Sequence, residues 1–430
     1  MSAEAARQHH HPENGVPIED LSSMEAVAQP VPVDFPEGGM RAWIVVASAS
    51  TISFCTFGIF QEYYKSHQLA GESPSTISWI GSIQIFFLFA GGLVGGPAFD
   101  RHGPMVLWPA VAAYILSIFL TSLCTEVYQF MLAQGILGGI GMGMLNAPSM
   151  AAVGQYFHKR RSTAMGIAVA GSSVGGVIFP VILSQMLNLS TLGFGWSIRI
   201  CGFIILILLL PATLGIRPRL QPRKARLLLL SAFKEPLFLG IVGSVFAMMI
   251  GVFLPLFFLP TYAISNGMSS ELAGFLPSIL NGASIFGRII PGIAADKLGC
   301  LNIFCAAGIS TAILIFFFPK AHSNAAIITF SALYGFTYGA IVSLMTVAFA
   351  MVPKSPKDTG TYLGMGLFVI AFGALMGPAV DGAFVSRYDG YSEVSVFCGI
   401  MVMVGAIGIG ATKVAMEKGF FSKLESKIQP

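Results

Sequence analysis

Long apolar runs, separated by short polar breaks, fill this chain from about residue 42 onward. A helix that crosses a bilayer needs roughly 20 mainly apolar residues, because the hydrocarbon core is about 30 Å thick. Only 10% of the 430 residues are charged, whereas soluble domains have about 25%. The pattern predicts an all-α integral membrane protein and argues against a soluble enzyme, a nucleic-acid binder and a secreted disulfide scaffold.

The apolar runs divide into twelve predicted transmembrane helices. Their ranges are 42–64, 76–99, 105–124, 128–156, 163–187, 195–216, 236–264, 271–295, 301–319, 324–352, 360–386 and 391–415. The longest internal break is basic and falls mid-chain. The predicted parts are a disordered tail at 1–40, six-helix halves at 41–216 and 236–415, a linker at 217–235 and a second tail at 416–430.

The distribution of Lys and Arg predicts the orientation of the chain, because cytoplasmic loops carry an excess of both. With an even number of helices, both termini share one side, and the loops of that side include the basic linker. The loops of the opposite side carry only Lys65, Lys320 and Arg387. We therefore expect both termini in the cytoplasm, with the plasma membrane as the location and the vacuolar membrane as the alternative.

An internal repeat relates the two halves. The pattern Gly-x-x-x-Asp-[Arg/Lys]-x-Gly ends the second predicted helix at 96–103 and the eighth at 292–299, which is 196 residues later. Glycine and proline residues of the fifth predicted helix recur in the eleventh at a separation of 198 residues. Duplicated six-helix halves are the build of many secondary transporters, whose substrate site lies between the halves near the bilayer midplane.

The repeated motif predicts a cytoplasmic gate. Its glycines allow close helix packing, and its charged pair can reach a neighbouring helix end in one conformation and release it in the other. The alternative is an ordinary surface ion pair, worth ~0–1 kcal/mol. We favour the gate because the motif occurs at equivalent places in both halves. The candidate gating residues are Asp100, Arg101, Gly103, Asp296, Lys297 and Gly299.

Arg288 stands out among the charged residues because it lies eight residues before Asp296, inside a predicted helix. That spacing places it ~12 Å from the helix end, where a buried arginine is costly and usually functional. Its planar guanidinium suits a carboxylate, although helix carbonyls could neutralise it instead. Ser284 and Asn281 share its helix face. The candidate substrate-binding residues are Arg288, Ser284, Asn281, Asn146 and Tyr338.

Three other charged residues, Arg199, Glu62 and Asp381, lie nearer helix ends, where structural pairing explains them as well as transport does. The sequence contains no nucleotide-binding P-loop and no Cys-x-x-Cys pair. His9–His11 could bind a metal, but we interpret them as part of a solvated tail. We therefore expect no cofactor, no metal and no enzymatic activity, and a proton gradient as the energy source.

Two sequence blocks narrow the family. Pro36-Glu-Gly-Gly-Met-Arg-Ala-Trp43 is similar to the acidic-Gly-Gly…Trp signature of the monocarboxylate porter family, and Tyr156-Phe-His-Lys-Arg-Arg161 begins its Tyr-Phe…Arg-Arg…Ala-x-Gly block. Together with the duplicated motif, the chain resembles the major facilitator superfamily and, within it, the fungal branch of that porter family.

The resemblance implies the major facilitator fold and proton-linked movement of monocarboxylates or, for many fungal relatives, export or uptake of other organic molecules, including secondary metabolites. It also implies that Arg288 engages a substrate carboxylate. Two departures put lactate-like symport in doubt. Ser284 stands where animal members have an Asp, and Phe54 where they have a Lys.

The predicted function is alternating-access transport of a monocarboxylate or related small organic acid across the lipid bilayer. A proton is the expected coupling ion and a monomer the functional unit, with no nucleic acid as partner. Two alternatives stay open. One is efflux or uptake of a neutral or bulky secondary metabolite, with Arg288 structural, and the other is a non-transporting membrane receptor on the same fold.

Overall fold

The structure, a computed structural model, describes residues 35–56, 69, 74–189, 193–221, 229–388 and 390–417. All elements below belong to the compact unit Pro36–Pro430. Most of the predicted N-terminal and C-terminal tails, and Glu62 of the first predicted helix, lie outside the described residues. Within these ranges every regular element is helical.

Each of the twelve predicted ranges contains helix, and in the first range the helix is described as far as Cys55. The first half contains α1 (Met40–Cys55), α3 (Pro74–Ala90), α4 (Gly92–His102), η2 (Gly103–Val106), α5 (Leu107–Thr121), α6 (Val127–Phe130), the π-helical η3 (Met131–Gly138), α7 (Gly139–Gly154), α8 (Arg161–Leu189) and α9 (Gly193–Gly215). The second contains η4 (Leu230–Lys234), α10 (Pro236–Gly251), α11 (Leu254–Ser265), α12 (Ser270–Leu298), α13 (Cys300–Phe317), η5 (Phe318–Lys320), α14 (Asn324–Met351), η6 (Pro356–Asp358), α15 (Thr359–Tyr388) and α16 (Ser392–Glu417).

Two predicted helices are interrupted. The range 76–99 is divided at Gly91 between α3 and α4. The range 236–264 is divided between α10 and α11, with Val252 and Phe253 as a turn between them. Pro255 stands in the first turn of α11. Proline has no backbone N–H to continue a helix that precedes it, but it fits the first turn of a new one.

Ten helical segments of the described residues are long and apolar enough to cross a bilayer, and α1 is shorter. One segment, Trp79–Thr121, runs for 43 residues through α3, α4 and α5. At about 1.5 Å per residue it is roughly twice as long as the bilayer core is thick. It therefore holds two crossings, which turn at Gly103, where φ is 65°. Gly299 makes the matching turn between α12 and α13, with φ 92°.

Large apolar side chains cover the outside of the bundle. Phe286, Ile207 and Leu214 are each more than 60% exposed. In water such a surface would be costly, whereas lipid tails solvate it. Inside a bilayer each backbone polar group also needs an internal partner, which helices provide.

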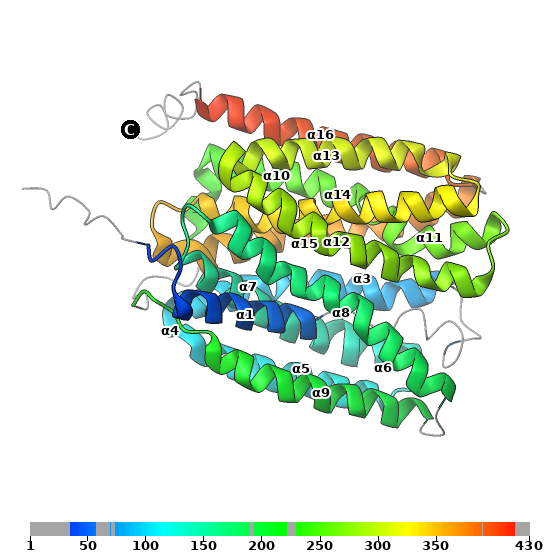
Figure 1. The fold of residues 1–430 in the computed structure, drawn as a ribbon, viewed down its shortest axis with the longest axis horizontal. Helices are drawn as coiled ribbons and strands as arrows, with labels where there is room; N and C mark the ends of the chain where they lie inside the picture. The colour runs from blue at the N-terminus through cyan, green and yellow to red at the C-terminus, as the bar shows by residue number, and fades with distance from the viewer. Residues whose placement is uncertain are drawn as a thin grey trace, which may run out of the picture. The chain divides into compact units, whose positions relative to one another are not determined.

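The helices of the Pro36–Pro430 unit run side by side, with α5 beside α9 and α13 beside α16 (Figure 1). Close glycine contacts occur at matching places in both halves. A Cβ on Gly143 of α7 would lie 2.5 Å from the Leu88 carbonyl oxygen of α3, and one on Gly339 of α14 would lie 2.7 Å from the Ser284 carbonyl oxygen of α12. These glycines are 196 residues apart, the separation of the two sequence motifs.

Candidate functional site

The two six-helix sets meet along two pairs of contacts. α8 packs against α12 and α14, and α15 packs against α3 and α4. Asp100 is near the end of α4, and Asp296 is near the end of α12. Both helices end on the side of the bundle where α1 begins and α16 ends, at the left of Figure 1. We call this end of the bundle the motif end.

Asp100 caps a helix of the other half. Its Oδ1 accepts the N–H of Gly360 at 3.2 Å, and its Oδ2 accepts the N–H and the hydroxyl of Thr361 at 2.6 and 2.8 Å. Gly360 and Thr361 form the first turn of α15, where backbone N–H groups lack intrahelical acceptors and the helix dipole favours negative charge. The carboxylate is only 5% exposed, so these bonds are shielded from water.

Asp296 makes the matching cap on α8. Its Oδ1 accepts the N–H of Ser162 at 2.8 Å, and its Oδ2 accepts the N–H and hydroxyl of Thr163 at 3.0 and 2.5 Å. Thr163 and Thr361 are 198 residues apart, so the two caps are equivalent by the repeat. Each half therefore holds the first turn of a helix from the other half.

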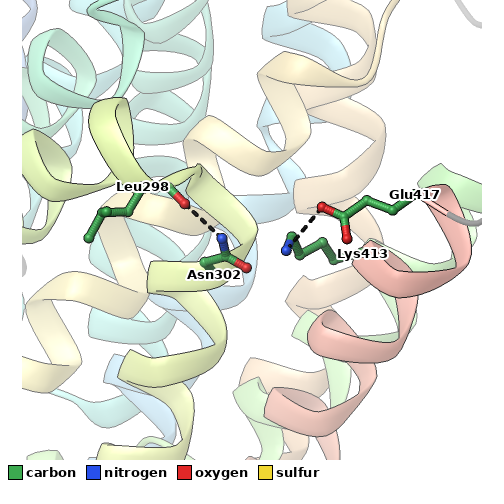
Figure 2. A network of polar contacts seen from close by, with 4 residues as sticks. All are labelled: Leu298, Asn302, Lys413 and Glu417. Atoms are coloured by element: carbon green, nitrogen blue, oxygen red, sulfur yellow. Dashed lines mark hydrogen bonds and ion pairs between the residues drawn. The ribbon is translucent and has the colours of Figure 1, made fainter.

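The remaining predicted gating residues differ in their contacts. Arg101 and Lys297 are exposed, and within the described ranges neither has a hydrogen bond or ion pair. Asp100 and Asp296 therefore cap the helix ends without a described contact from Arg101 or Lys297. Gly103 and Gly299 provide the two positive-φ turns. Figure 2 shows the region of the second turn, where the Asn302 amide donates to the Leu298 carbonyl at 2.7 Å. It also shows an ion pair on α16, between Lys413 and Glu417 at 3.1 Å.

Backbones touch directly beside the two caps. A Cβ on Gly96 would overlap the carbonyl oxygen of Gly360, and one on Gly166 would overlap that of Arg288. No residue other than glycine fits these places without moving a helix. The motif end is therefore closed in this conformation.

Arg288 lies on α12 at the contact between the halves and is 4% exposed. Its Nη1 donates to the Val169 carbonyl at 2.8 Å and to the Ser172 hydroxyl, both on α8. Its Nε is buried and has no hydrogen-bond acceptor. No Asp or Glu in the described part of the chain pairs with it. A buried donor without an acceptor is rare and costly, so the guanidinium has capacity for one more acceptor.

Two further predicted binding residues lie close to this arginine. The Ser173 hydroxyl of α8 donates to that of Ser284 at 3.1 Å, one turn from Arg288 on α12. Tyr338 of α14 interacts electrostatically with Arg288 and is half-buried. Arg288, Ser284 and Tyr338 therefore form one group between α8, α12 and α14, which we call the Arg288 site.

The other two predicted binding residues are engaged elsewhere. The Asn281 amide donates to the Pro277 carbonyl of its own helix at 2.9 Å. Asn146 donates to the Thr56 hydroxyl at 2.7 Å and accepts from Ser53 at 3.4 Å. Asn146 thereby joins α7 to α1 within the first half, and none of its hydrogen bonds reaches the Arg288 site.

Arg199 also has a structural environment. Its Nε donates to the Ser122 hydroxyl at 3.1 Å, and its guanidinium lies over the Trp196 ring, 5.1 Å from the centroid. These contacts tie the start of α9 to the end of α5.

Glu37 is a site residue that sequence reasoning missed. Its Oε1 accepts the N–H groups of His158 and Lys159 at 2.9 and 2.7 Å, and its Oε2 accepts that of Arg160 at 3.2 Å. Partial burial acts to raise the pKa of Glu37, but these three N–H groups outweigh it and hold the pKa below its ordinary value. The start of α8 thus receives one carboxylate from its own half and one from the other. Glu37 belongs to the block 36–43, which carried the family resemblance but no structural role.

Residues 42–378 match the family model of the Major Facilitator Superfamily. The chain belongs to this superfamily. The aspyridones efflux protein apdF of Emericella nidulans is 47% identical over 394 residues, which cover 90% of this chain and 81% of that protein. The fujikurins efflux protein of Gibberella fujikuroi is 36% identical over 400 residues, which cover 89% of this chain and 85% of that protein.

The crystal structure of the human organic anion transporter MFSD10 (TETRAN) aligns with 89% of this chain and 100% of its own, with a TM-score of 0.69 and 16% identity. At that identity the likeness shows a common fold. The predicted all-α major facilitator fold is confirmed. The protein is a multi-pass membrane transporter for a small molecule, and the superfamily and these relatives are transporters, which are not enzymes.

Proposed function

We propose that this superfamily member exports a secondary metabolite that carries an acidic group, by alternating access between its two halves. The efflux proteins to which it is similar favour export of a secondary metabolite, the alternative reading of the sequence, over specificity for simple monocarboxylates. The observation that supports an acidic group on the substrate is the buried Nε of Arg288, which has no hydrogen-bond acceptor among the described residues.

An anionic group of the substrate would supply that acceptor. Arginine can hold a carboxylate or similar planar anion through two parallel hydrogen bonds. Arg288 donates to α8 from its own position on α12. A ligand bound to it therefore touches the contact that has to change when the halves move against each other.

The residues at positions 284 and 54 have surroundings that differ from those expected for lactate-like symport. Ser284 bonds to Ser173 across the halves. Phe54 packs against Phe179, with ring centroids 5.0 Å apart, and so presents an apolar group where animal porters have a charge. These contacts support a substrate with apolar surface beside its acidic group.

The two caps supply the gate. Opening the motif end requires Asp100 and Asp296 to release α15 and α8 together, since both join the same two halves. We assign the motif end to the cytoplasm on the basic loops, the halves to 41–216 and 236–415, and the linker to 217–235. The closed motif end then corresponds to the stage at which an exporter releases its metabolite to the other side. The plasma membrane is the proposed location and a monomer the functional unit.

Flux in proteoliposomes with an imposed pH gradient tests this proposal. The panel contains acidic secondary metabolites, neutral ones and simple monocarboxylates, each offered to the wild type, Arg288→Gln and Arg288→Lys. Arg387→Gln is the matched control, because Arg387 is an exposed arginine at the end of α15. We expect the wild type and the control to move acidic metabolites, Arg288→Lys to move them weakly and Arg288→Gln not at all.

Thermal unfolding of each purified variant checks that a loss of flux is not a loss of fold. Movement of neutral compounds alone by the wild type would refute the proposal. Equal flux of an acidic metabolite in the wild type and Arg288→Gln would refute the role of the arginine.

A further inference from the structure

Asp381 is a fully buried carboxyl group on α15, with an exposure of 0%. Its Oδ1 accepts a hydrogen bond from the Cys398 thiol at 3.0 Å, and its Oδ2 has no hydrogen-bond partner. No Lys, Arg or His of the described residues pairs with it. A buried carboxylate without a cationic partner is very costly, whereas the neutral carboxylic acid is far less so.

The helices packed around α15 contribute few titratable groups near Asp381. α16 contributes Cys398, and also the buried hydroxyl of Ser395, which has no hydrogen-bond partner. α14 contributes Tyr334, which interacts electrostatically with Asp381. α11 carries Tyr262, whose buried hydroxyl is likewise without a partner.

The other neighbours offer no counter-charge. α3, α7 and α10 contain no titratable side chain. The charged residues of α4 and η6 lie at the motif end, and Thr361, which Asp100 caps, is 20 residues from Asp381, or ~30 Å along α15. Arg387 of α15 itself is exposed. Among the residues that the structure describes, the region around Asp381 is therefore polar but contains no cation.

Two stacked tyrosines of α14 lie near Asp381 and near the Arg288 site. The Tyr334 and Tyr338 rings stack with centroids 6.0 Å apart and planes 11° apart. Tyr334 lies near Asp381, and Tyr338 lies near Arg288. Asp381 lies seven residues, ~10 Å, from the end of α15 that is remote from the motif end, and Arg288 lies 18 residues, ~27 Å, into α12 from that same side. The two groups are at different depths but belong to one connected region.

We propose that Asp381 is the group that binds and releases the coupling proton of this transporter. The inference rests on the proposed function and adds to its transport cycle a proton, the coupling ion expected from the sequence. The carboxylate takes a proton from water on one side, which forms an O–H bond, and returns that proton to water when the other side opens. No further reactant is needed.

The conformation described here fits one stage of that cycle. The motif end is closed, Arg288 has a donor without an acceptor, and Asp381 is shut off from water. This is the arrangement expected after an exporter has released its anion and taken up a proton. The cycle then exchanges metabolite outward for proton inward.

Infrared spectroscopy of the purified protein in lipid tests the proton site without a substrate. We expect acid-minus-alkaline difference spectra of the wild type to contain the carbonyl stretch of a protonated carboxyl group. This band should be absent from Asp381→Asn and present at a shifted frequency in Asp381→Glu. Glu393→Gln, which removes an exposed carboxylate of α16, is the matched control and leaves the band in place. A band of equal size in the wild type and Asp381→Asn would overturn the proposal.

Transport by the same variants supplies a second readout, with a pH-sensitive dye inside the vesicles. In Asp381→Asn we expect an imposed pH gradient to add nothing to metabolite flux, and exchange to become independent of pH. Gradient-driven flux equal to that of the wild type would overturn the assignment. If the wild type moves no metabolite, the proposed function fails, while the infrared band still decides the role of Asp381.

Discussion

Neutralising either cap should open the motif end. Asp100→Asn keeps the size of the side chain but removes its charge and replaces one acceptor oxygen by an NH₂ group. Whichever way the amide turns, at least one N–H of Gly360 or Thr361 then faces another donor. Asp296→Asn does the same to Ser162 and Thr163, because the two caps have the same bonding pattern.

The size of the effect follows from the bonds lost. A buried donor without an acceptor costs ~1–3 kcal/mol, and each bond that turns from charged to neutral loses ~1 kcal/mol. With the unsatisfied donor taken at its lower limit of about 1 kcal/mol and ~1 kcal/mol for each of two weakened bonds, the sum is about 3 kcal/mol for each variant. Since every ~1.4 kcal/mol is tenfold, the equilibrium between the closed and open motif end should shift by about 100-fold toward open.

Spin labels on opposite halves measure this equilibrium. His102 and Lys357 are exposed at the motif end, on α4 and η6, and pulsed electron paramagnetic resonance gives the distance distribution between labels there. We expect a short, narrow distribution in the wild type and a long component of similar size in both variants. Arg101→Gln is the control, because its side chain is exposed and has no described partner. An unchanged distribution in Asp100→Asn, or a shift as large in Arg101→Gln, would refute the reasoning.

Three further predictions concern neighbouring residues. Gly96→Ala should abolish transport, because the added methyl group would overlap the Gly360 carbonyl, while Gly243→Ala, where a methyl group meets nothing within 4 Å, should leave flux in proteoliposomes unchanged. Because the pKa of Glu37 is held below its ordinary 4.5, its carboxylate stabilises the fold above pH 4.5, and that contribution is lost as the pH falls through the lowered pKa. Thermal unfolding should therefore show Glu37→Gln less stable than the wild type at pH 7, by about 1 kcal/mol as for a lost helix cap, with the difference vanishing in acid. Asn146→Ala should lower the free energy of unfolding by ~1–3 kcal/mol without changing which metabolite is moved. A changed substrate preference would show that Asn146 takes part in substrate binding.

The sequence predicts the helices well because the bilayer dictates them. Each apolar run has to be long enough to cross and has to satisfy its own backbone, so its limits follow from composition. The exceptions are the ranges 76–99, which is divided at Gly91, and 236–264, where Pro255 lies in the first turn of a new helix inside an unbroken apolar run. Hydropathy does not register a missing N–H group, so the turn before Leu254 was not predicted.

The sequence also predicts which residues matter at the motif end but not how they act. The duplicated acids were recognised by their spacing. Their partners, in the first turns of α15 and α8, begin 260 and 134 residues away in the chain. Four of the six hydrogen bonds come from backbone N–H groups, and two come from threonine hydroxyls. No side-chain pattern marks a backbone N–H as a partner, which is also why the role of Glu37 stayed hidden.

By itself the sequence determined the membrane class, most of the helix ranges and the arginine inside a membrane helix, and it predicted two related halves. These depend on local composition and on repetition along the chain. Only the tertiary structure decided that Asn146 is hydrogen-bonded to the end of α1. It also decided that, among the described residues, Arg288 keeps a donor without an acceptor and Asp381 is buried without a cation. Each depends on which helices become neighbours, because the free energy of a buried polar group is set by the groups around it rather than by its place in the chain.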